Sequence, residues 1–437
     1  MQDIEPELHR RPASATVAPS VSLHEDHEDP NLANCPPPDG GLVAYLSVLS
    51  GFLVVMNTWG LIISFGVFQT YYDSSLGQSR SDVAWIGSIT VFLLFFGGIV
   101  SGRLTDAGHF RITVTLGAIF LVVGTFMTSL CTKYWQLILA QGVCVGLGNG
   151  LLLTPHLTVI STYFNKKLPL ALGIAACGSV TGGLIYPSMA RVLLPSIGFG
   201  WTMRSIGFIQ LATLAIALAG VRPRFRPVPG TRLLVDWGAF NELEFMLFSI
   251  GVFLAYLGSF FPFFFLTSYA REEQGMSYVD ALDLLLVLNG IGFIARLFPS
   301  LLSTYFGTLN TFIGLIFASS LCMYTWIAVQ SLSGLYVWTA FYSISVGGVQ
   351  SLFPAAVASL SPDRSKLGYQ MGIISSAVGF GALIGSPISG QLISINGGSY
   401  VAAQVFAGSA LAAGCGLIFE AREIRRKKQS SHLLSKL

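Results

Sequence analysis

The sequence predicts an all-α integral membrane protein with about 12 transmembrane helices in two six-helix bundles. Three observations lead to this fold class: an apolar composition, a series of long hydrophobic stretches and an internal repeat. The chain has 437 residues, of which 53% are hydrophobic and 10% are charged. Ordinary soluble domains carry about 25% charged residues. A chain so poor in charge is therefore expected to be surrounded mainly by lipid.

The hydrophobic stretches have the length of membrane crossings, because a bilayer core of about 30 Å needs about 20 apolar residues per helix. In hydrocarbon, the backbone polar groups must be satisfied inside such helices. The first half contains stretches at 42–68, 83–102, 112–131, 135–160, 169–190 and 202–220. The second half contains stretches at 245–268, 281–304, 311–329, 334–359, 369–394 and 399–419.

Identical residues recur in the two halves at a constant offset of 199 positions. The recurring residues are Gly148, Pro155, Gly173, Ile174 and Gly182, with counterparts Gly347, Pro354, Gly372, Ile373 and Gly381. Duplicated bundles with a site near the bilayer midplane are typical of secondary transporters. The chain is therefore divided into a tail (1–40), a first bundle (41–220), a linker (221–241), a second bundle (242–420) and a basic tail (421–437).

The distribution of charge predicts the orientation. Most of the 24 Lys and Arg residues lie in segments that are cytoplasmic if both termini are inside, and the outer loops hold only Arg80, Lys133 and Arg271. This is the positive-inside pattern, so the basic segments indicate a lipid bilayer and no nucleic-acid partner. The N-terminal tail is polar and rich in proline and acidic residues, and we expect it to be disordered. The plasma membrane is the expected location, with the vacuolar membrane as the alternative.

The loop after the second stretch contains Gly102, Asp106, Gly108 and Arg111. It resembles the signature loop between helices 2 and 3 of the major facilitator superfamily, and the resemblance implies the major facilitator fold. Glycines permit a tight turn. Asp106 can cap a helix or pair with an arginine, forming a latch that breaks when the two halves rock. A charged loop without a gating role is the alternative.

Two further segments resemble motifs of the monocarboxylate porter family, and the overall style is similar to its fungal members. One is Asp39-Gly40-Gly41 after Pro38, directly before the first helix. The other runs over 163–187 and includes Lys166 and Lys167. The resemblance implies transport of a small carboxylate, another metabolite or a secondary metabolite, with protons as the coupling ion.

Arg296 is the strongest candidate for substrate binding, because it lies well inside the eighth stretch. An arginine at the centre of a membrane helix costs about 2.5–3.5 kcal/mol and usually faces a water-filled cavity. Its planar guanidinium suits a carboxylate. Animal porters place an aspartate four residues before this arginine and a lysine in helix 1, whereas this chain has Gly292 there and no basic residue from 41 to 79. An arginine that pairs with backbone carbonyls is the structural alternative.

Other polar residues inside the stretches are expected to face the centre. Asn289 lies about two turns before Arg296 on nearly the same helical face. The remaining candidates are Asn57, Asn149, His156 and Gln350. Each of them could instead form an interhelical hydrogen bond. His156 could also titrate near neutral pH and carry a proton.

The seventh stretch contains Tyr256 and a cluster of five phenylalanines between 260 and 265. These rings could line a pocket for an aromatic substrate, or serve helix packing and lipid contact. Pro155 and Pro354 interrupt equivalent helices and are predicted to be flexible points, because irregular helices occur at transporter sites.

These observations predict a secondary active transporter that moves a small, monocarboxylate-like organic anion or related metabolite by alternating access, coupled to protons. The first alternative is an efflux transporter for a secondary metabolite made by a fungal biosynthetic gene cluster. The second is a non-transporting receptor on the same scaffold. No nucleophile, metal-ligand or cofactor pattern occurs within the stretches, so no enzyme, metal or cofactor is expected. The oligomeric state stays open.

Overall fold

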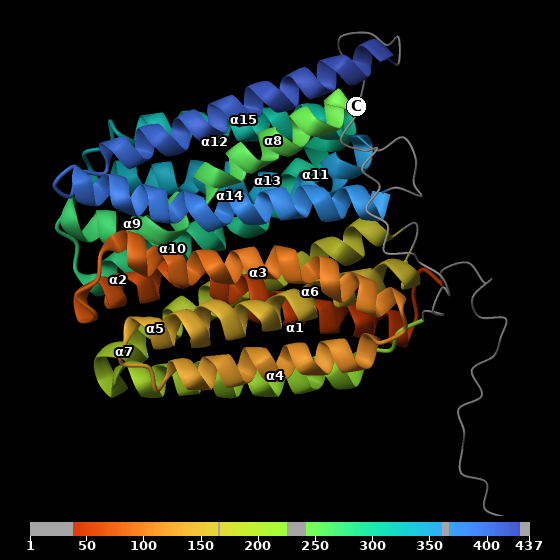
Figure 1. The fold of residues 1–437 in the computed structure, drawn as a ribbon, viewed down its shortest axis with the longest axis horizontal. Helices are drawn as coiled ribbons and strands as arrows, with labels where there is room; N and C mark the ends of the chain where they lie inside the picture. The colour runs from red at the N-terminus through yellow and green to blue at the C-terminus, as the bar shows by residue number, and fades with distance from the viewer. Residues whose placement is uncertain (1–37, 165–166, 225–241, 361–366, 429–437) are drawn as a thin grey trace, which may run out of the picture. The chain divides into compact units, whose positions relative to one another are not determined.

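The computed structural model describes residues 38–164, 167–224, 242–360 and 367–428 (Figure 1). Within these ranges, 11 helices are long and apolar enough to cross a membrane. One of them, Leu170–Gly220, has 51 residues and contains two of the predicted stretches. Its backbone breaks at Gly198, which has φ 77. The predicted all-α membrane fold is thus confirmed. Most of both predicted tails and of the linker lies outside the described residues.

The elements follow the predicted stretches closely. The first half contains α1 (Leu42–Ile63), α2 (Phe65–Ser75), α3 (Arg80–Asp106), α4 (Phe110–Thr128), α5 (Tyr134–Leu137), the π-helical segment η2 (Ile138–Cys144), α6 (Val145–Tyr163) and α7 (Leu168–Gly220). The second half contains α8 (Leu243–Ser259), α9 (Phe261–Glu272), α10 (Tyr278–Gly290), α11 (Gly292–Phe306), α12 (Thr308–Trp326), α13 (Leu332–Leu360), α14 (Leu367–Ile395) and α15 (Val401–Lys428).

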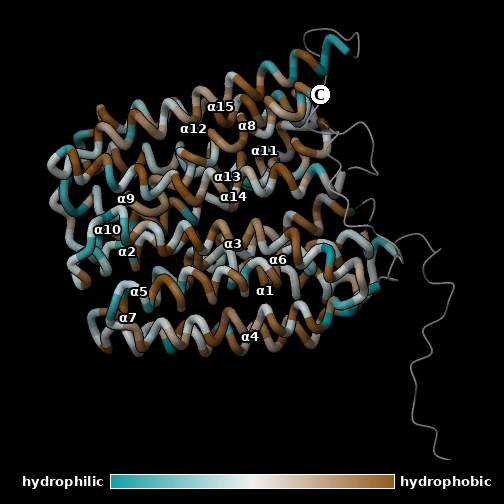
Figure 2. The backbone as a smooth tube through the Cα atoms, viewed as in Figure 1, coloured by the Kyte–Doolittle hydropathy of each residue, from teal (hydrophilic) through white to brown (hydrophobic). Residues whose placement is uncertain are grey.

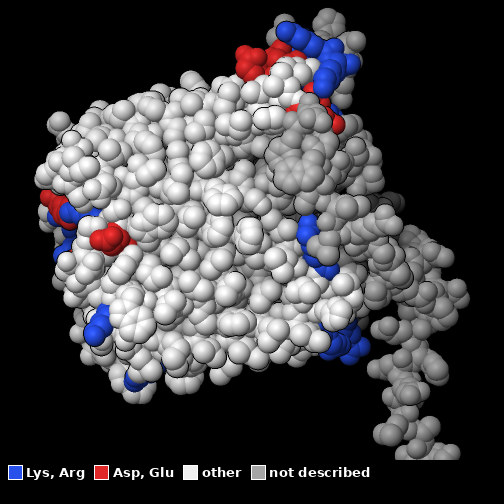
Figure 3. Space-filling model, viewed as in Figure 1, with Lys and Arg blue, Asp and Glu red and all other residues white. Residues whose placement is uncertain are grey.

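The surface is consistent with a protein embedded in lipid. The helices are hydrophobic along most of their length and become hydrophilic toward their ends (Figure 2). The face shown in Figure 3 carries its charged side chains toward the ends of the helices, with a broad uncharged band between them. We refer to the end that the charge pattern predicts to face outward as the outer end, and to the other as the inner end.

The recurring glycines pack equivalent helices together in each half. A Cβ atom on Gly182 of α7 would lie 2.2 Å from the backbone oxygen of Met56 in α1. A Cβ atom on its counterpart Gly381 in α14 would lie 2.4 Å from the backbone oxygen of Phe253 in α8. Small residues allow membrane helices to approach this closely. The internal repeat therefore reflects a duplicated helix–helix contact.

Three crossings are interrupted near their middle. The first breaks at Ser64, between α1 and α2, and the Ser64 hydroxyl donates to the Gly60 carbonyl at 2.6 Å. The seventh breaks at Phe260, between α8 and α9, and the eighth at Ile291, between α10 and α11. Pro155 and Pro354, the predicted flexible points, lie inside the continuous helices α6 and α13.

Candidate functional site

Five aromatic side chains connect the two halves near these interruptions. The Trp59 ring of α1 stacks on Phe260, with centroids 6.5 Å apart and planes inclined by 8°. Trp59 also contacts Phe95 of α3 at 5.7 Å, and Phe95 contacts Tyr256 of α8 at 6.3 Å. Tyr256 contacts Phe353 of α13 at 5.8 Å. These separations are typical of aromatic pairs. We call the five residues the aromatic bridge.

The sequence predicted Tyr256 as a site residue and raised Phe260 as a possible pocket residue, but Trp59, Phe95 and Phe353 were not predicted. Tyr256, Phe260 and Phe353 are buried, whereas Trp59 and Phe95 are half-buried. A signal for Trp59 was available. Tryptophan in membrane proteins concentrates at the interfaces with water, and Trp59 lies well inside its span, Leu42–Asp73.

Asn57 lies two residues before Trp59 on α1 and forms hydrogen bonds within the first half. Its Nδ2 donates to the Leu53 carbonyl at 2.7 Å and to the Thr213 hydroxyl at 2.9 Å. Its Oδ1 accepts from the Tyr186 hydroxyl at 2.7 Å. The amide therefore ties α1 to both parts of α7.

Asn289 connects the two halves directly. Its Nδ2 donates to the backbone carbonyl of Gly183 in α7 at 3.1 Å. Gly183 permits this approach, because a Cβ atom there would lie 2.8 Å from the Asn289 side-chain carbon Cγ. Asn289 is therefore placed at the interface between the halves.

Arg296 follows on the same crossing and is half-buried. Its Nη1 donates to the Gly292 carbonyl one turn earlier, at 3.2 Å. A Cβ atom on Gly292 would lie 2.7 Å from that nitrogen, and 3.3 Å from Val180 of α7. Gly292, which has no side chain, thus gives the guanidinium room to fold against the backbone. Cys177 of α7 is close enough to interact with Arg296 electrostatically.

Three further candidates, on α6 and α13, have enclosed polar atoms. The His156 Nδ1 contacts the Leu152 carbonyl at 2.8 Å, and its ring packs on Phe110 of α4, inside the first half. Among the described residues, no hydrogen-bond partner reaches the Asn149 amide, the His156 Nε2 or the Gln350 Nε2. Enclosed polar atoms in native proteins are normally satisfied, often by water. Asn149 and Gln350 are therefore the better candidates to meet a polar ligand group.

The two segments that resemble the porter family contact each other at the inner end. The backbone N–H of Asp39 donates to the Tyr163 carbonyl at 3.1 Å. The Asp39 side chain accepts from the backbone N–H of Lys167 at 3.4 Å. Asp39 and Gly41 both have positive φ, at 50 and 95, and Gly40 lies between them. Lys166 lies outside the described residues.

The loop of the superfamily signature makes a tight turn between α3 and α4. Gly108 has φ 86, and its N–H donates to the Thr105 carbonyl at 2.9 Å. Gly102 lies in the last turns of α3, and Arg111 is exposed at the start of α4. The Asp106 side chain lies outside what the structure describes, so its proposed role as a latch stays a prediction.

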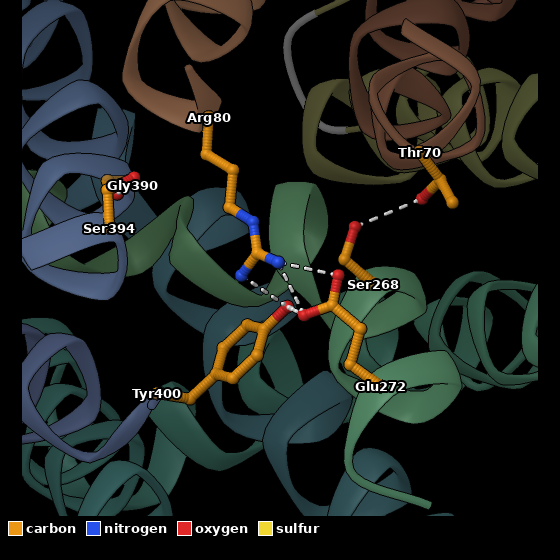
Figure 4. A network of polar contacts seen from close by, with 7 residues as sticks. All are labelled: Thr70, Arg80, Ser268, Glu272, Gly390, Ser394 and Tyr400. Carbon is orange, nitrogen blue, oxygen red and sulfur yellow. Dashed lines mark hydrogen bonds and ion pairs between the residues drawn. The ribbon is translucent and has the colours of Figure 1, made fainter. Parts of the chain in front are cut away.

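Figure 4 shows a charged contact at the outer end, between Arg80, Glu272 and Tyr400, that was not predicted from the sequence. Arg80 Nη2 donates to both carboxylate oxygens of Glu272, each at 2.6 Å. Its Nη1 donates to the Tyr400 hydroxyl at 3.2 Å, and that hydroxyl donates to Glu272 at 2.9 Å. Burial raises the pKa of the Tyr400 hydroxyl, Arg80 lowers it and Glu272 raises it again, so the hydroxyl stays a donor. We call these three residues the outer latch.

Further contacts beside the latch also join the halves. Arg191 of α7 forms an ion pair with Asp283 of α10. The Thr70 and Ser268 hydroxyls lie 3.2 Å apart (Figure 4). At the inner end, Glu244 forms ion pairs within the second half, with Arg425 at 3.8 Å and Lys428 at 2.7 Å. The structure thus has a closed outer end.

Comparison with known proteins agrees with this architecture. The Major Facilitator Superfamily model matches residues 48–340. An MFS-type transporter of Gibberella zeae is 44% identical over 408 residues, which cover 92% of each chain. The aspyridones efflux protein of Emericella nidulans is 32% identical over 413 residues, 92% of this chain and 84% of its own. The MFS-type transporter dbaD of the same species is 37% identical over 82% of this chain and 80% of its own. The chain is therefore a multi-pass membrane transporter, and not an enzyme, and belongs to the Major Facilitator Superfamily.

Proposed function

We propose that the protein exports a small aromatic secondary metabolite from the cytoplasm by alternating access. This is the first alternative raised by the sequence, and two findings favour it over the carriage of a short monocarboxylate. One relative is named as an efflux protein for aspyridones. The aromatic bridge then supplies the observation that carries the proposal.

The aromatic bridge lies at the interface between the two halves, and each half contributes rings to it. Trp59 and Phe95 come from the first half, and Tyr256, Phe260 and Phe353 come from the second. Flat aromatic ligands bind well between such rings, because stacked and edge-to-face pairs add about 0.5–1.5 kcal/mol beyond burial of area. A substrate ring inserted between the halves would replace ring–ring contacts across the interface with contacts to itself.

Arg296 would then bind an acidic group on the substrate. Its Nη1 donates to a backbone carbonyl in its own helix at 3.2 Å, a contact that a carboxylate or enolate can replace with a stronger charge-assisted hydrogen bond. We take the resemblance to the monocarboxylate porter family to concern the fold and not the substrate. The contact between Asp39 and Tyr163, which joins the two segments that carry the resemblance, supports this. We place the protein in the plasma membrane, with the vacuolar membrane as the alternative, and take protons as the coupling ion.

Ligand-dependent thermal stabilisation of the purified protein tests the substrate class. The probes are lactate, 1-naphthoate and 1-naphthol, which separate a short carboxylate, an aromatic anion and a neutral aromatic. A ligand at about 100 times its Kd adds about 2.7 kcal/mol of stability. We expect naphthoate to stabilise the wild type strongly, naphthol less, and lactate not at all. Stabilisation by lactate alone would return the assignment to a monocarboxylate carrier.

Two variants and a matched control locate the site. Trp59→Leu should abolish the response to both aromatic probes, and Arg296→Gln should remove the advantage of naphthoate over naphthol. Trp135→Leu is the control, because Trp135 is 58% exposed on the outside of the bundle, and its response should equal that of the wild type. Vesicles with an acidic lumen then test flux of naphthoate. Saturable binding without flux would favour the receptor alternative.

A further inference from the structure

Asp73 is a half-buried acidic side chain next to the outer latch. It lies near the C-terminus of α2, three residues after Thr70. Both carboxyl oxygens are enclosed by protein, and among the described residues no hydrogen-bond partner reaches either of them. An enclosed carboxyl group without partners is rare in native proteins and calls for an explanation.

The groups around Asp73 come from several elements. Arg80 of α3, together with Arg271, Glu272 and Ser268 of α9, is close enough to interact with its carboxyl group. Tyr400, which precedes α15, also interacts with it electrostatically. The carboxyl group is thus enclosed between the first half, to which it belongs, and the second.

The two neighbouring cations are already engaged elsewhere. Arg80 binds both oxygens of Glu272 and the hydroxyl of Tyr400. The Arg271 guanidinium lies over the ring of Tyr278, 5.6 Å from its centroid. The carboxylate of Glu272 adds a like charge nearby. Asp73 is thus enclosed without an ion pair of its own.

Ionising such a group in the closed outer end is unfavourable. A charge taken out of water costs several kcal/mol unless a partner compensates for it. If the two halves separate at this end, water reaches the carboxyl group and the cost disappears. We propose that Asp73 is the pH-responsive group of the outer end: its carboxyl is protonated while the outer latch is closed and ionises when the latch opens.

The direction of the effect follows from linkage. Closing the outer end binds a proton, so acid favours the closed end and alkaline conditions favour the open end, by up to tenfold per pH unit for one proton. Together with the export function proposed above, an acidic exterior would return the empty transporter to the state that loads from the cytoplasm. The linkage itself requires no substrate.

Distance measurements by double electron–electron resonance test the proposal in the full chain. Spin labels are placed at Gln78, in the turn before α3, and Glu273, after α9, both exposed, in a background in which the six cysteines are replaced. We expect one short distance at pH 5.5 and a second, longer distance at pH 8.0, with the ratio of short to long falling at least about tenfold. In Asp73→Asn the short distance should persist at both pH values.

Asp82→Asn is the matched control, because Asp82 is an acidic residue at the same end whose carboxylate accepts a hydrogen bond from Ser79 at 2.6 Å. It should keep the full pH response, and so should Asp73→Glu. If Asp73→Asn does not fold, Asp73→Ser replaces it. A parent protein that ignores pH, or an Asp73 variant that still responds, would overturn the proposal. The distance measurement uses no substrate, so it remains valid even if vesicles show no export. If vesicles show export but the spin-label distance does not change with pH, only the proposal for Asp73 is refuted.

Discussion

The outer and inner ends of this transporter use their charges differently. At the outer end, Arg80–Glu272 and Arg191–Asp283 pair residues of opposite halves. At the inner end, in the ranges that the structure covers, the ion pairs of Glu244 and Glu423 connect helices or turns of the second half only. Charge pairs across an interface can be exchanged for water when the halves separate, whereas pairs within one half stabilise it in every state. The outer pairs are therefore suited to gating and the inner pairs to stability.

The largest effect is expected from filling a close contact between α2 and α9, just beyond the interruptions on the outer side. A Cβ atom on Gly66 of α2 would lie 2.4 Å from the Phe263 backbone oxygen in α9, so Gly66→Val should force the outer ends apart. Overpacking of this kind costs about 1–3 kcal/mol. The spin-label distance between positions 78 and 273 should lengthen. Gly372→Ala, where the nearest atom is Ile99 Cγ1 at 3.9 Å, is the inner-end control and should leave the distance unchanged.

A second pair of variants compares the two kinds of ion pair. Glu272→Gln leaves Arg80 without its bidentate partner and should shift the outer end toward the open state by about tenfold, or about 1.4 kcal/mol. Glu244→Gln should lower the thermal unfolding temperature and leave the outer distance as in the wild type. Equal effects of the two variants on the outer distance would show that the ends do not differ as described.

A charge exchange tests whether the Arg191–Asp283 pair acts across the interface. Arg191→Asp alone places two carboxylates side by side and should open the outer end by a few-fold, because like charges repel in partly exposed sites. Adding Asp283→Arg should restore the wild-type distance. The same exchange applied to Glu423 and Arg426, three residues apart on α15, should not change it. Failure of the double variant to recover would rule out a direct pairing.

The smallest effect is expected from Tyr400→Phe. This change removes a hydroxyl that accepts from Arg80 and donates to Glu272 but leaves their ion pair in place. One hydrogen bond contributes about 0.5–1.5 kcal/mol, so the closed population should fall by only a few-fold. An effect larger than that of Glu272→Gln would make Tyr400, and not the ion pair, the main element of the latch.

Much of the fold could be predicted, because composition and stretch length are properties of each segment by itself. The recurring glycines were also informative: Gly182 and Gly381 mark the same contact in each half. The division into tails, bundles and linker stays a prediction. The interruption at Ser64 could not be anticipated, since that position carries neither glycine nor proline. The interruption at Phe260 had an available signal, because Pro262 lies in the first turn of α9.

Less of the site could be predicted. Asn289 and Tyr256 lie at contacts between the halves, but their roles in substrate binding stay predictions, as do those of Arg296, Asn149 and Gln350. The outer latch was missed because Arg80 and Glu272 are 192 residues apart, and no local pattern connects them. Which residues pair across the interface depends on how the two halves pack together. The hydrophobic periodicity of the sequence contains no information on that packing.

The hydrogen bond from Asn289 to Gly183 joins the two halves close to the interruption of the eighth crossing at Ile291. When the halves rock against each other, a hydrogen bond near the axis of rotation changes length least. It would therefore persist while one end opens and the other closes. Its acceptor is a main-chain oxygen on a residue without a side chain, so no side-chain deletion in the first half can remove it. The Asn289 side chain, in the second half, is therefore the only side chain on which this fixed contact depends. Loss of the hydrogen bond would slow both directions of the cycle equally instead of favouring one state.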